Sequence, residues 1–208
     1  MLFFTADPHF GHLNIIKYCY RPFSDENEMD RALTENWNSV VKNEDEVFIL
    51  GDIAMTQNAD RVYNYLRRLN GKKHVILGNH DSCLTRNREK FEKILLSITS
   101  QKTIDVDGTE IIMTHHPRFT YEECFSDNVW HLFGHIHNNA VQNAVCNLMP
   151  NNLNVGVDCC NYRPISFDEV KSRIQKRNRF LNEENCLKIT SLINECLPDH
   201  WEHILRNS

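Results

Sequence analysis

The stretch Val75-Ile76-Leu77-Gly78-Asn79-His80-Asp81 joins a short apolar run to side chains that bind metals or transfer protons. An apolar run that ends at a turn residue is typical of a buried strand. Four other stretches repeat this pattern: Leu2–Thr5 before Asp7-Pro8-His9, Val47–Leu50 before Gly51-Asp52, Ile111–Thr114 before His115, and Leu132-Phe133 before Gly134-His135-Ile136-His137. Sites of α/β folds lie in the loops that follow buried strands. The sequence therefore predicts an α/β enzyme that binds metal ions through the residues of these loops.

Helices are predicted between these strands. Met29, Leu33, Trp37 and Val40 mark one helix face, which begins at Ser24 or Asp25. Val62, Leu66 and Leu69 mark a second helix that ends at Asn70-Gly71, and Ser166 with Glu169 forms a capping box before a third. The pattern also predicts a hairpin between Ser97 and Met113 that turns at Asp107-Gly108, and a last strand at Leu153–Val157. From Leu181 onward, apolar spacing predicts an amphipathic helix that stops at Pro198.

Composition restricts the class of protein. A chain of 208 residues suits one sizeable domain. Its apolar stretches are too short for a bilayer span and its N-terminus lacks the pattern of a signal peptide, so we expect a soluble cytoplasmic protein with no membrane partner. The eight cysteines have no C-x-x-C pair, which favours reduced thiols over a disulfide framework. A net charge of −5 argues against general nucleic-acid binding.

In this order, the five blocks resemble the calcineurin-like metallophosphoesterase superfamily, whose motifs are D-x-H, G-D, G-N-H-[DE], H and G-H-x-H. The resemblance extends to a branch of small bacterial and phage proteins through Phe4–Asp7, Phe10–His12, Asn14–Ile16, Arg21–Phe23 and Asn161–Ser166. It implies a two-sheet β-sandwich flanked by helices. We expect this domain to span residues 1–180 and a helical extension to span residues 181–208.

The resemblance also implies two metal ions per chain that share Asp52. One ion would be held by Asp7, His9, Asp52 and His137, and the other by Asp52, Asn79, His115 and His135. A carboxylate suits the shared position because it can offer one oxygen to each cation. Residues two apart in an extended loop point the same way, so the side chains of Asp7 and His9 are expected to reach one ion. An N/O ligand set without thiolate favours manganese first, with iron, nickel or zinc as alternatives, over calcium.

The implied reaction is hydrolysis of a small phosphate ester by a hydroxide that bridges two metal ions. His80 resembles the catalytic histidine of the family, and we expect Asp81 to orient its ring through a hydrogen bond. A helix-capping or turn role for Asp81 is an equal alternative. Arg21, His12 and His116 are candidates for substrate binding, each with a surface or structural role as the alternative.

Other functions are weighed against this one. A protein serine/threonine phosphatase would carry D-R-G after the second motif, and Gly51–Met55 does not. The net negative charge of the chain argues against a nuclease. A catalytically silent binding scaffold would have lost motif residues, and all are present here. The sequence leaves open the substrate, the choice between monoester and diester, and the oligomeric state.

Overall fold

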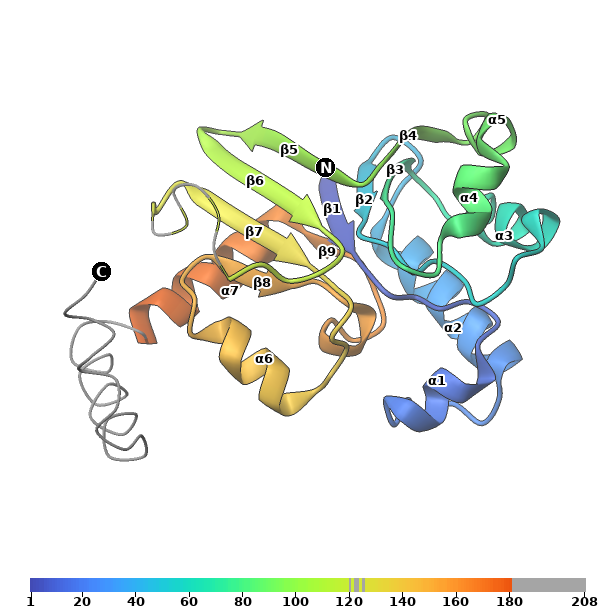
Figure 1. Ribbon diagram of the computed structural model, residues 1–208, viewed down its shortest axis with the longest axis horizontal. Helices are drawn as coiled ribbons and strands as arrows, with labels where there is room; N and C mark the ends of the chain where they lie inside the picture. Colours follow the sequence, from blue (N-terminus) through green and yellow to red (C-terminus); the bar gives the residue numbers. More distant parts are fainter. Residues whose placement is uncertain (120, 122–123, 125, 181–208) are drawn as a thin grey trace, which may run out of the picture.

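The strands of the protein form two sheets in its computed structural model, which describes residues 1–180 apart from residues 120, 122, 123 and 125. The first sheet has the order β4-β3-β2-β1-β9 and the second has the order β5-β6-β7-β8 (Figure 1). The first sheet comprises β1 (Leu2–Thr5), β2 (Glu46–Ile49), β3 (Lys72–Ile76), β4 (Leu95–Thr99) and β9 (Ile165–Ser166). The second comprises β5 (Gln101–Val106), β6 (Thr109–Thr114), β7 (Val129–Phe133) and β8 (Asn152–Asn154).

Parallel pairing brings the strand ends that carry the motif blocks to a common edge in each sheet. In the first sheet β1, β2, β3 and β4 are parallel, and β9 is antiparallel to β1. In the second sheet β6, β7 and β8 are parallel, and only β5 runs against its neighbour. The two sheets meet at a bridge between Ala6 and Gly156, directly after β1 and β8. This bridge places the loops that follow both sets of strands beside each other.

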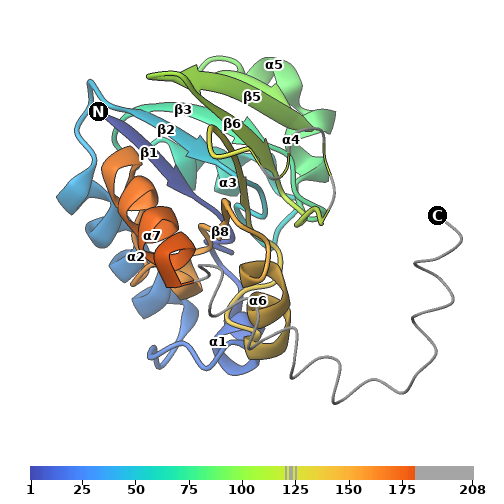
Figure 2. The ribbon, with the colours of Figure 1, turned by 90° about the vertical axis from the view of Figure 1, so that its left-hand side faces the viewer.

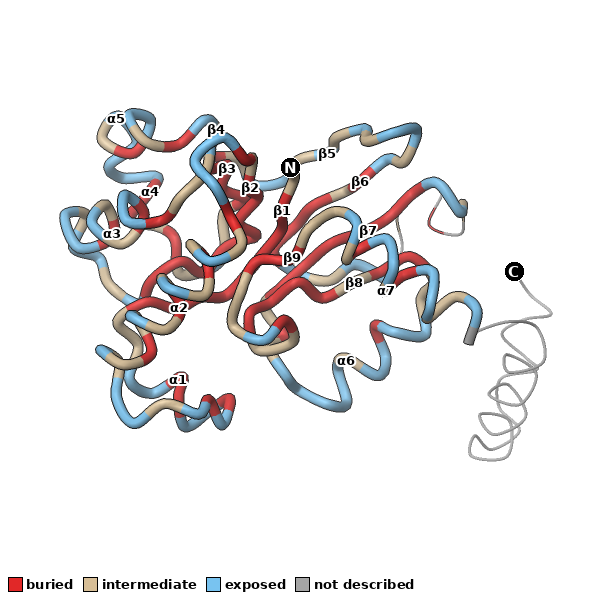
Figure 3. The backbone as a smooth tube through the Cα atoms, turned by 180° about the vertical axis from the view of Figure 1, so that it is seen from behind, coloured by how far each residue is buried: buried red, intermediate tan, exposed pale blue. Residues whose placement is uncertain are grey.

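Side chains of the first sheet alternate between two hydrophobic cores. Phe4, Phe48 and Ile76 pack with Met113 and Leu132 of the second sheet, which makes the interior of a sandwich. The alternate residues Phe3, Val47, Ile49 and Val75 face the helices instead. Figure 3 shows the buried backbone concentrated in these strands, with the exposed residues on the helices and loops around them.

Helices flank this sandwich (Figures 1 and 2). Those that pack on the first sheet are α1 (Leu13–Tyr18), α2 (Glu26–Val40), α3 (Ala59–Leu66), α4 (Ser82–Arg86) and α5 (Arg88–Phe91). The others are α6 (Ala140–Asn147), α7 (Phe167–Phe180) and the 3-10 turn η1 (Val157–Cys159). α7 closes the core between the sheets with Val170 and Ile174. The predicted two-sheet sandwich flanked by helices is confirmed.

Two predicted elements differ from the structure. The hairpin turns at Asp107-Gly108 as expected, but β4 is a separate strand that pairs with β3 in the first sheet. The predicted strand at Leu153–Val157 ends as β8 at Asn154, because Ala6 takes over the pairing from there. The predicted C-terminal helix lies outside the described residues. No helix in the described part of the chain is long and apolar enough to cross a bilayer, and its six cysteines form no disulfide.

Candidate metal centre

The loops after β1 and β2 are bonded to each other, which places the first two motif blocks side by side. The backbone N–H of Asp7 donates to the carbonyl of Gly51 at 3.0 Å, and that of His9 donates to the carbonyl of Asp52 at 3.1 Å. The second sheet joins this group through Asp7, whose Oδ2 accepts the N–H of His135 at 2.8 Å. The motif blocks of both sheets therefore meet in one cluster of polar side chains.

All seven residues predicted as metal ligands lie in this cluster, in two groups that share Asp52. The ligand atoms of Asp7, His9 and His137 lie within 4.8 Å of one another, and we call this group the Asp7 half. Nε2 of His9 lies 3.6 Å from Oδ2 of the shared Asp52. The His115 half consists of Asn79, His115 and His135.

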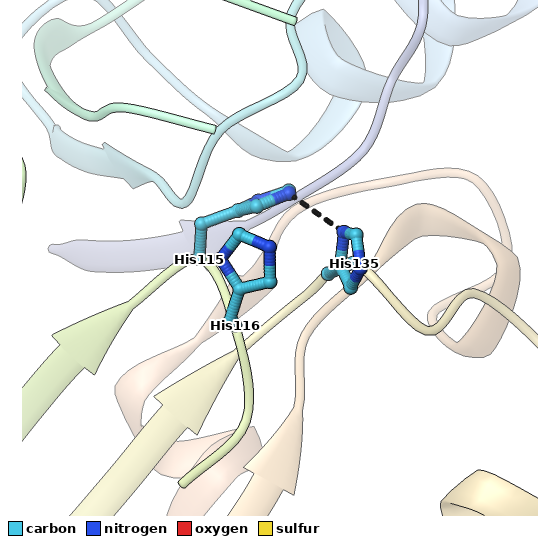
Figure 4. A group of neighbouring side chains, drawn as sticks. All are labelled: His115, His116 and His135. Atoms are coloured by element: carbon cyan, nitrogen blue, oxygen red, sulfur yellow. Dashed lines mark hydrogen bonds between the residues drawn. The ribbon is translucent and has the colours of Figure 1, made fainter. Parts of the chain in front are cut away.

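Atoms of the His115 half converge on Nε2 of His115. This nitrogen lies 3.1 Å from Oδ1 of Asn79, 3.2 Å from Nδ1 of His135 and 3.4 Å from Oδ2 of Asp52. Figure 4 shows His115 and His135 pointing toward each other from the ends of neighbouring strands, with His116 beside them. The other ring nitrogen, Nδ1, donates to the carbonyl of Leu50 at 2.7 Å, which leaves Nε2 as the free ligand atom.

These residues fit a metal site. Nε2 of His115 faces two oxygens, Oδ1 of Asn79 and Oδ2 of Asp52, and contacts between such lone pairs are stable only with a proton or a cation between the atoms. Oδ1 of Asp7 and both ring nitrogens of His9 are buried without any hydrogen-bond partner. Buried polar atoms normally have partners, because leaving one unsatisfied costs about 1–3 kcal/mol. Imidazole, carboxylate and amide donors, arranged in two groups around one carboxylate, are the set that would satisfy these atoms by binding metal.

The pKa values of the cluster show how strongly its groups depend on one another's charge. Burial raises the pKa of Asp7 to about 7. Burial lowers the pKa of His135 to about 4. For His115 burial opposes protonation, but its bond to Asp52 and the charge of Asp7 raise the pKa to about 8. The nearby carboxylates thus favour a positive charge at His115, and a metal ion would supply that charge in place of a proton.

Five of the seven residues have a left-handed backbone: φ is 57° at Asp7, 53° at His9, 54° at Asp52, 69° at His135 and 48° at His137. This region is uncommon for residues other than glycine and costs roughly 1–2 kcal/mol per residue. The expected extended loop from Asp7 to His9 is therefore wrong. Both residues reach the cluster because each one bends the backbone, and such strain gathers at functional sites.

Arg21 stabilises this strained loop, and its predicted contact with substrate is wrong. Its side chain is fully buried. The guanidinium donates to the carbonyls of Asp7 and Pro8, both at 2.8 Å. It also donates to both carboxylate oxygens of Asp158, at 2.8 and 2.9 Å. No donor is left to face a ligand, so Arg21 is a structural residue that joins the first motif to η1.

Asp81 also differs from its prediction, because its carboxylate does not contact the His80 ring. Oδ2 accepts the backbone N–H groups of Asp52 and Gly78, both at 2.8 Å, and Oδ1 accepts that of Ile53 at 3.0 Å. Of its two alternative roles, the helix cap is absent, since Asp81 precedes α4 without a capping bond from its side chain. The turn role is present, because residues 79–81 form a turn and the carboxylate accepts the N–H of Gly78. Asp81 instead joins the loops after β2 and β3, and so fixes the backbone that carries Asp52.

Two glycines allow these loops to approach each other. Gly51 has φ 88°, and a Cβ atom there would lie 2.6 Å from the backbone nitrogen of Gly78. A Cβ atom at Gly78 would collide with the carboxylate of Asp52. The G-D and G-N-H motifs therefore need glycine because the backbones of their loops touch.

Residues 6–156 match the family model of the calcineurin-like phosphoesterase superfamily domain. The chain belongs to this superfamily. It is 36% identical over 177 residues to protein MJ1445 of Methanocaldococcus jannaschii, a match that covers 84% of this chain and 92% of that protein. It is also 27% identical to the gene 66 protein of Mycobacterium phage D29, over 83% of this chain and 95% of that protein. The crystal structure of AQ665 from Aquifex aeolicus, a protein of unknown function, aligns with a TM-score of 0.63 at 27% identity, covering 84% of this chain and 99% of that one.

The other candidate residues of this calcineurin-like protein lie at different depths. His80 lines a cleft above the centre, with its side chain 36% exposed and Nε2 3.9 Å from Oδ2 of Asp52. His12 also lines the cleft, and its ring centroid is 5.3 Å from that of His9. His116 is exposed, does not line the cleft, and packs its ring on His135 with centroids 4.1 Å apart. A ligand in the cleft could therefore contact His80 and His12, whereas His116 lies beside the metal centre and outside the cleft.

Sequence reasoning missed Asp158. Its Oδ2 accepts a hydrogen bond from Nδ1 of His137 at 2.8 Å, which leaves Nε2 of His137 free toward the Asp7 half. Burial opposes protonation of His137, but this bond raises the pKa of the imidazole to about 10. A carboxylate behind a ligand histidine orients the ring and raises its basicity. The only signal for Asp158 in the sequence is its place shortly after the predicted strand Leu153–Val157, as the motif residues follow their strands.

Proposed function

We propose that this protein is a metal-dependent phosphoesterase that hydrolyses a phosphomonoester or a phosphodiester. The observation that supports the proposal is that seven potential ligands converge in two groups around one carboxylate, and that several of their buried atoms have no hydrogen-bond partner. The seven residues are Asp7, His9, Asp52, Asn79, His115, His135 and His137. Membership in the calcineurin-like superfamily supports the same reading. Asp52 is the proposed shared ligand because its Oδ2 faces histidines of both halves.

Two divalent cations, with manganese as the first candidate and iron, nickel or zinc as alternatives, would supply an activated water and would neutralise the charge of the phosphate. The chain itself fixes the geometry of their ligands. Leu50 and Asp158 each accept a hydrogen bond from Nδ1 of a ligand histidine and so leave Nε2 free. Such outer partners hold a metal site ready for binding.

We assign His80 as the group that gives a proton to the leaving oxygen. Its backbone N–H donates to Oδ1 of Asp52 at 2.9 Å, so the residue is tied to the centre by its main chain. Its ring stands at the wall of the cleft, where the ester oxygen of a bound substrate would lie. A positioned general acid typically contributes about 10²–10⁴-fold to the rate. His12, on the same cleft, is the proposed contact for a phosphate oxygen.

The test combines metal content with turnover. The purified protein, loaded with Mn²⁺, should contain two ions per chain by elemental analysis and should hydrolyse nitrophenyl phosphate esters. Removal of the ions with a chelator should abolish turnover, and re-addition should restore it. Two bound ions without turnover of any ester in a broad panel of monoesters and diesters would contradict the proposal and favour a silent binding scaffold.

His80→Ala tests the assigned proton donor. Nitrophenolate leaves readily without a proton, whereas an alkoxide does not. We therefore expect a modest loss of kcat/KM on nitrophenyl esters and a loss of about 10²–10⁴-fold on alkyl or nucleoside esters. His12→Ala, measured on the same esters, is the matched control because His12 is a neighbouring histidine of the same cleft. An equal loss of kcat/KM on all esters for His80→Ala would show that His80 stabilises phosphate charge instead.

A further inference from the structure

The cleft above the metal centre has almost no charged side chain in its walls. It has a volume of about 860 Å³ and is lined by residues of α1, the segment that follows α1, the loop after β7 and the first turn of α6. Figures 1 and 2 show α1 and α6 at the same end of the molecule. Nineteen described residues line the cleft. None of them is Lys, Arg or Glu, and Asp52 carries the only carboxylate among them. Charge is therefore confined to the floor, where the metal centre lies.

This distribution limits the phosphate content of the ligand. A phosphate bound outside the metal centre would need Lys or Arg, or a helix N-terminus, to replace its hydration. The walls provide no such side chains among the residues that the structure describes, and one N–H group at the N-terminus of α6, that of Gln142, is already bonded to Oδ1 of Asn139. The cleft therefore suits a substrate with one phosphate and an uncharged organic part.

The walls offer aromatic faces and amides to that organic part. Tyr18 and Tyr20 are 70% and 88% exposed, which is unusual for residues of this size. Tyr20 also has a left-handed backbone with φ 51°, and the next residue, Arg21, is buried and held by Asp158. The anchored Arg21 thus directs the neighbouring Tyr20 outward, and the strained backbone maintains this exposure.

The same walls are fixed relative to each other. Nδ2 of Asn138 donates to the carbonyl of Cys19 at 2.7 Å, which ties the α6 side of the cleft to the α1 side. The ring of His12 meets the edge of Tyr18 with centroids 6.4 Å apart. Asn14 and Gln142, one on each side, add amide donors and acceptors. Aromatic faces stack on nucleobases, and amide side chains hydrogen-bond to base edges.

We propose that the cleft is a nucleoside subsite, so that the substrate is a nucleoside ester with a single phosphate at the metal centre. This inference rests on the proposed phosphoesterase function and names its substrate class. Oligonucleotides and nucleoside polyphosphates are disfavoured substrates because their additional phosphates meet no cation in the walls. Stacking of a base on a protein aromatic contributes about 1–3 kcal/mol, which corresponds to a preference of roughly 5- to 150-fold.

The first experiment uses three nitrophenyl phosphodiesters that share one leaving group. They are ethyl p-nitrophenyl phosphate, thymidine 5′-(p-nitrophenyl phosphate), and the latter compound with an extra 3′-phosphate. We expect kcat/KM to be roughly 10-fold or more higher for the thymidine ester than for the ethyl ester, and to fall when the 3′-phosphate is added. Equal values for the ethyl and thymidine esters, or the highest value for the 3′-phosphorylated ester, would overturn the proposal.

Variants locate the effect in the cleft. Tyr20→Ala should remove most of the preference for thymidine over ethyl, while Leu96→Ala, at an exposed residue of β4, should leave that preference as it is in the wild type. Val141→Lys adds a cation to the cleft wall and should raise kcat/KM for the 3′-phosphorylated ester selectively. Val145→Lys, one turn further along α6 and outside the cleft, is the matched control. Equal effects of the two lysines would contradict the assignment of this wall.

Binding without turnover separates this inference from the proposed function. Titration calorimetry on the Mn²⁺-loaded protein should show that thymidine 5′-monophosphate binds roughly 10-fold more tightly than ethyl phosphate, and that Tyr20→Ala removes the difference. If no ester is hydrolysed but this preference remains, the subsite stands and the catalytic proposal fails. If esters are hydrolysed but the two phosphates bind equally, the subsite fails and the catalytic proposal stands.

Discussion

The two halves of the metal centre are held in place by different means. In the Asp7 half the support comes from side chains, since Asp158 accepts a bond from His137 and holds Arg21, which in turn bonds the carbonyls of the first motif. In the His115 half the support is main chain, because Nδ1 of His115 donates to the carbonyl of Leu50. A support made of side chains can be removed by one substitution outside the ligand set, whereas a backbone carbonyl cannot. The comparison predicts that the two halves respond differently to mutation.

The largest effect is expected where the halves meet. Asp52→Asn should lose both ions, because an amide offers one oxygen in place of two charged ones. The loss of metal affinity should exceed the roughly 10- to 100-fold that outer partners cause. Elemental analysis and ester hydrolysis would measure it, with Asp45→Asn as the control at a buried aspartate remote from the centre. Full occupancy in Asp52→Asn would remove the shared assignment.

Asp158→Asn should act on one half only. Without the carboxylate behind it, His137 becomes less basic, and the Asp7 half should bind its ion about 10- to 100-fold more weakly. The His115 half should keep its affinity, so a metal titration should separate into a tight and a weak step. Asp158→Ala should in addition destabilise the fold by about 3–5 kcal/mol, because the buried guanidinium of Arg21 loses its partner. Two equally weakened steps in Asp158→Asn would show that the halves share this support.

A pH effect should appear in the strands beneath the His115 half. His131 on β7 is fully buried and its Nε2 lies 2.8 Å from Oγ1 of Thr114, the residue before His115. Burial lowers its pKa from 6.5 to about 4. Between these values the unfolded chain binds a proton that the folded chain does not, so stability falls as pH drops from 6.5 toward 4 and does not change through this group above 6.5.

Urea unfolding of wild type and His131→Asn at pH 7 and pH 5 measures this contribution. Wild type should lose about 2 kcal/mol more than the variant between these two pH values. Comparing the two proteins cancels the titration of all other groups. Parallel losses in both proteins would mean that another group causes the acid sensitivity.

The smallest effect is expected at His116. Its ring packs on His135 from the exposed side and lies outside the cleft. His116→Ala should therefore leave both metal steps in place and should change stability by no more than about 0.5 kcal/mol. A clear weakening of the second ion would add His116 to the His115 half, beside the ligands it already neighbours.

The strand-to-loop pattern was sufficient to place the seven candidate ligands in one cluster, because parallel strands deliver their carboxyl ends to a common edge. The pattern failed where a contact depends on chain geometry. Arg21 and Asp158 are 137 residues apart, and no local signal pairs them. Asp81 has the right position to orient His80, but the close approach of Gly51 and Gly78 places backbone N–H groups nearer to its carboxylate. The left-handed backbone at Asp7 and His9 likewise comes from the bonds that enclose the loop.

The bridge between Ala6 and Gly156 has a consequence for the order of events in folding. Asp7, Asp52 and Asn79 follow strands of the first sheet, and His115, His135 and His137 follow strands of the second. An ion that contacts both sets would cross-link the two layers, and its affinity would become folding free energy. On the ribosome, the ligands of the His115 half would be complete once the chain beyond His135 had emerged, whereas the Asp7 half, with Asp158 behind His137, would be complete only after the chain beyond Asp158 had emerged. Metal uptake by nascent chains of increasing length would thus report the moment at which the two layers dock.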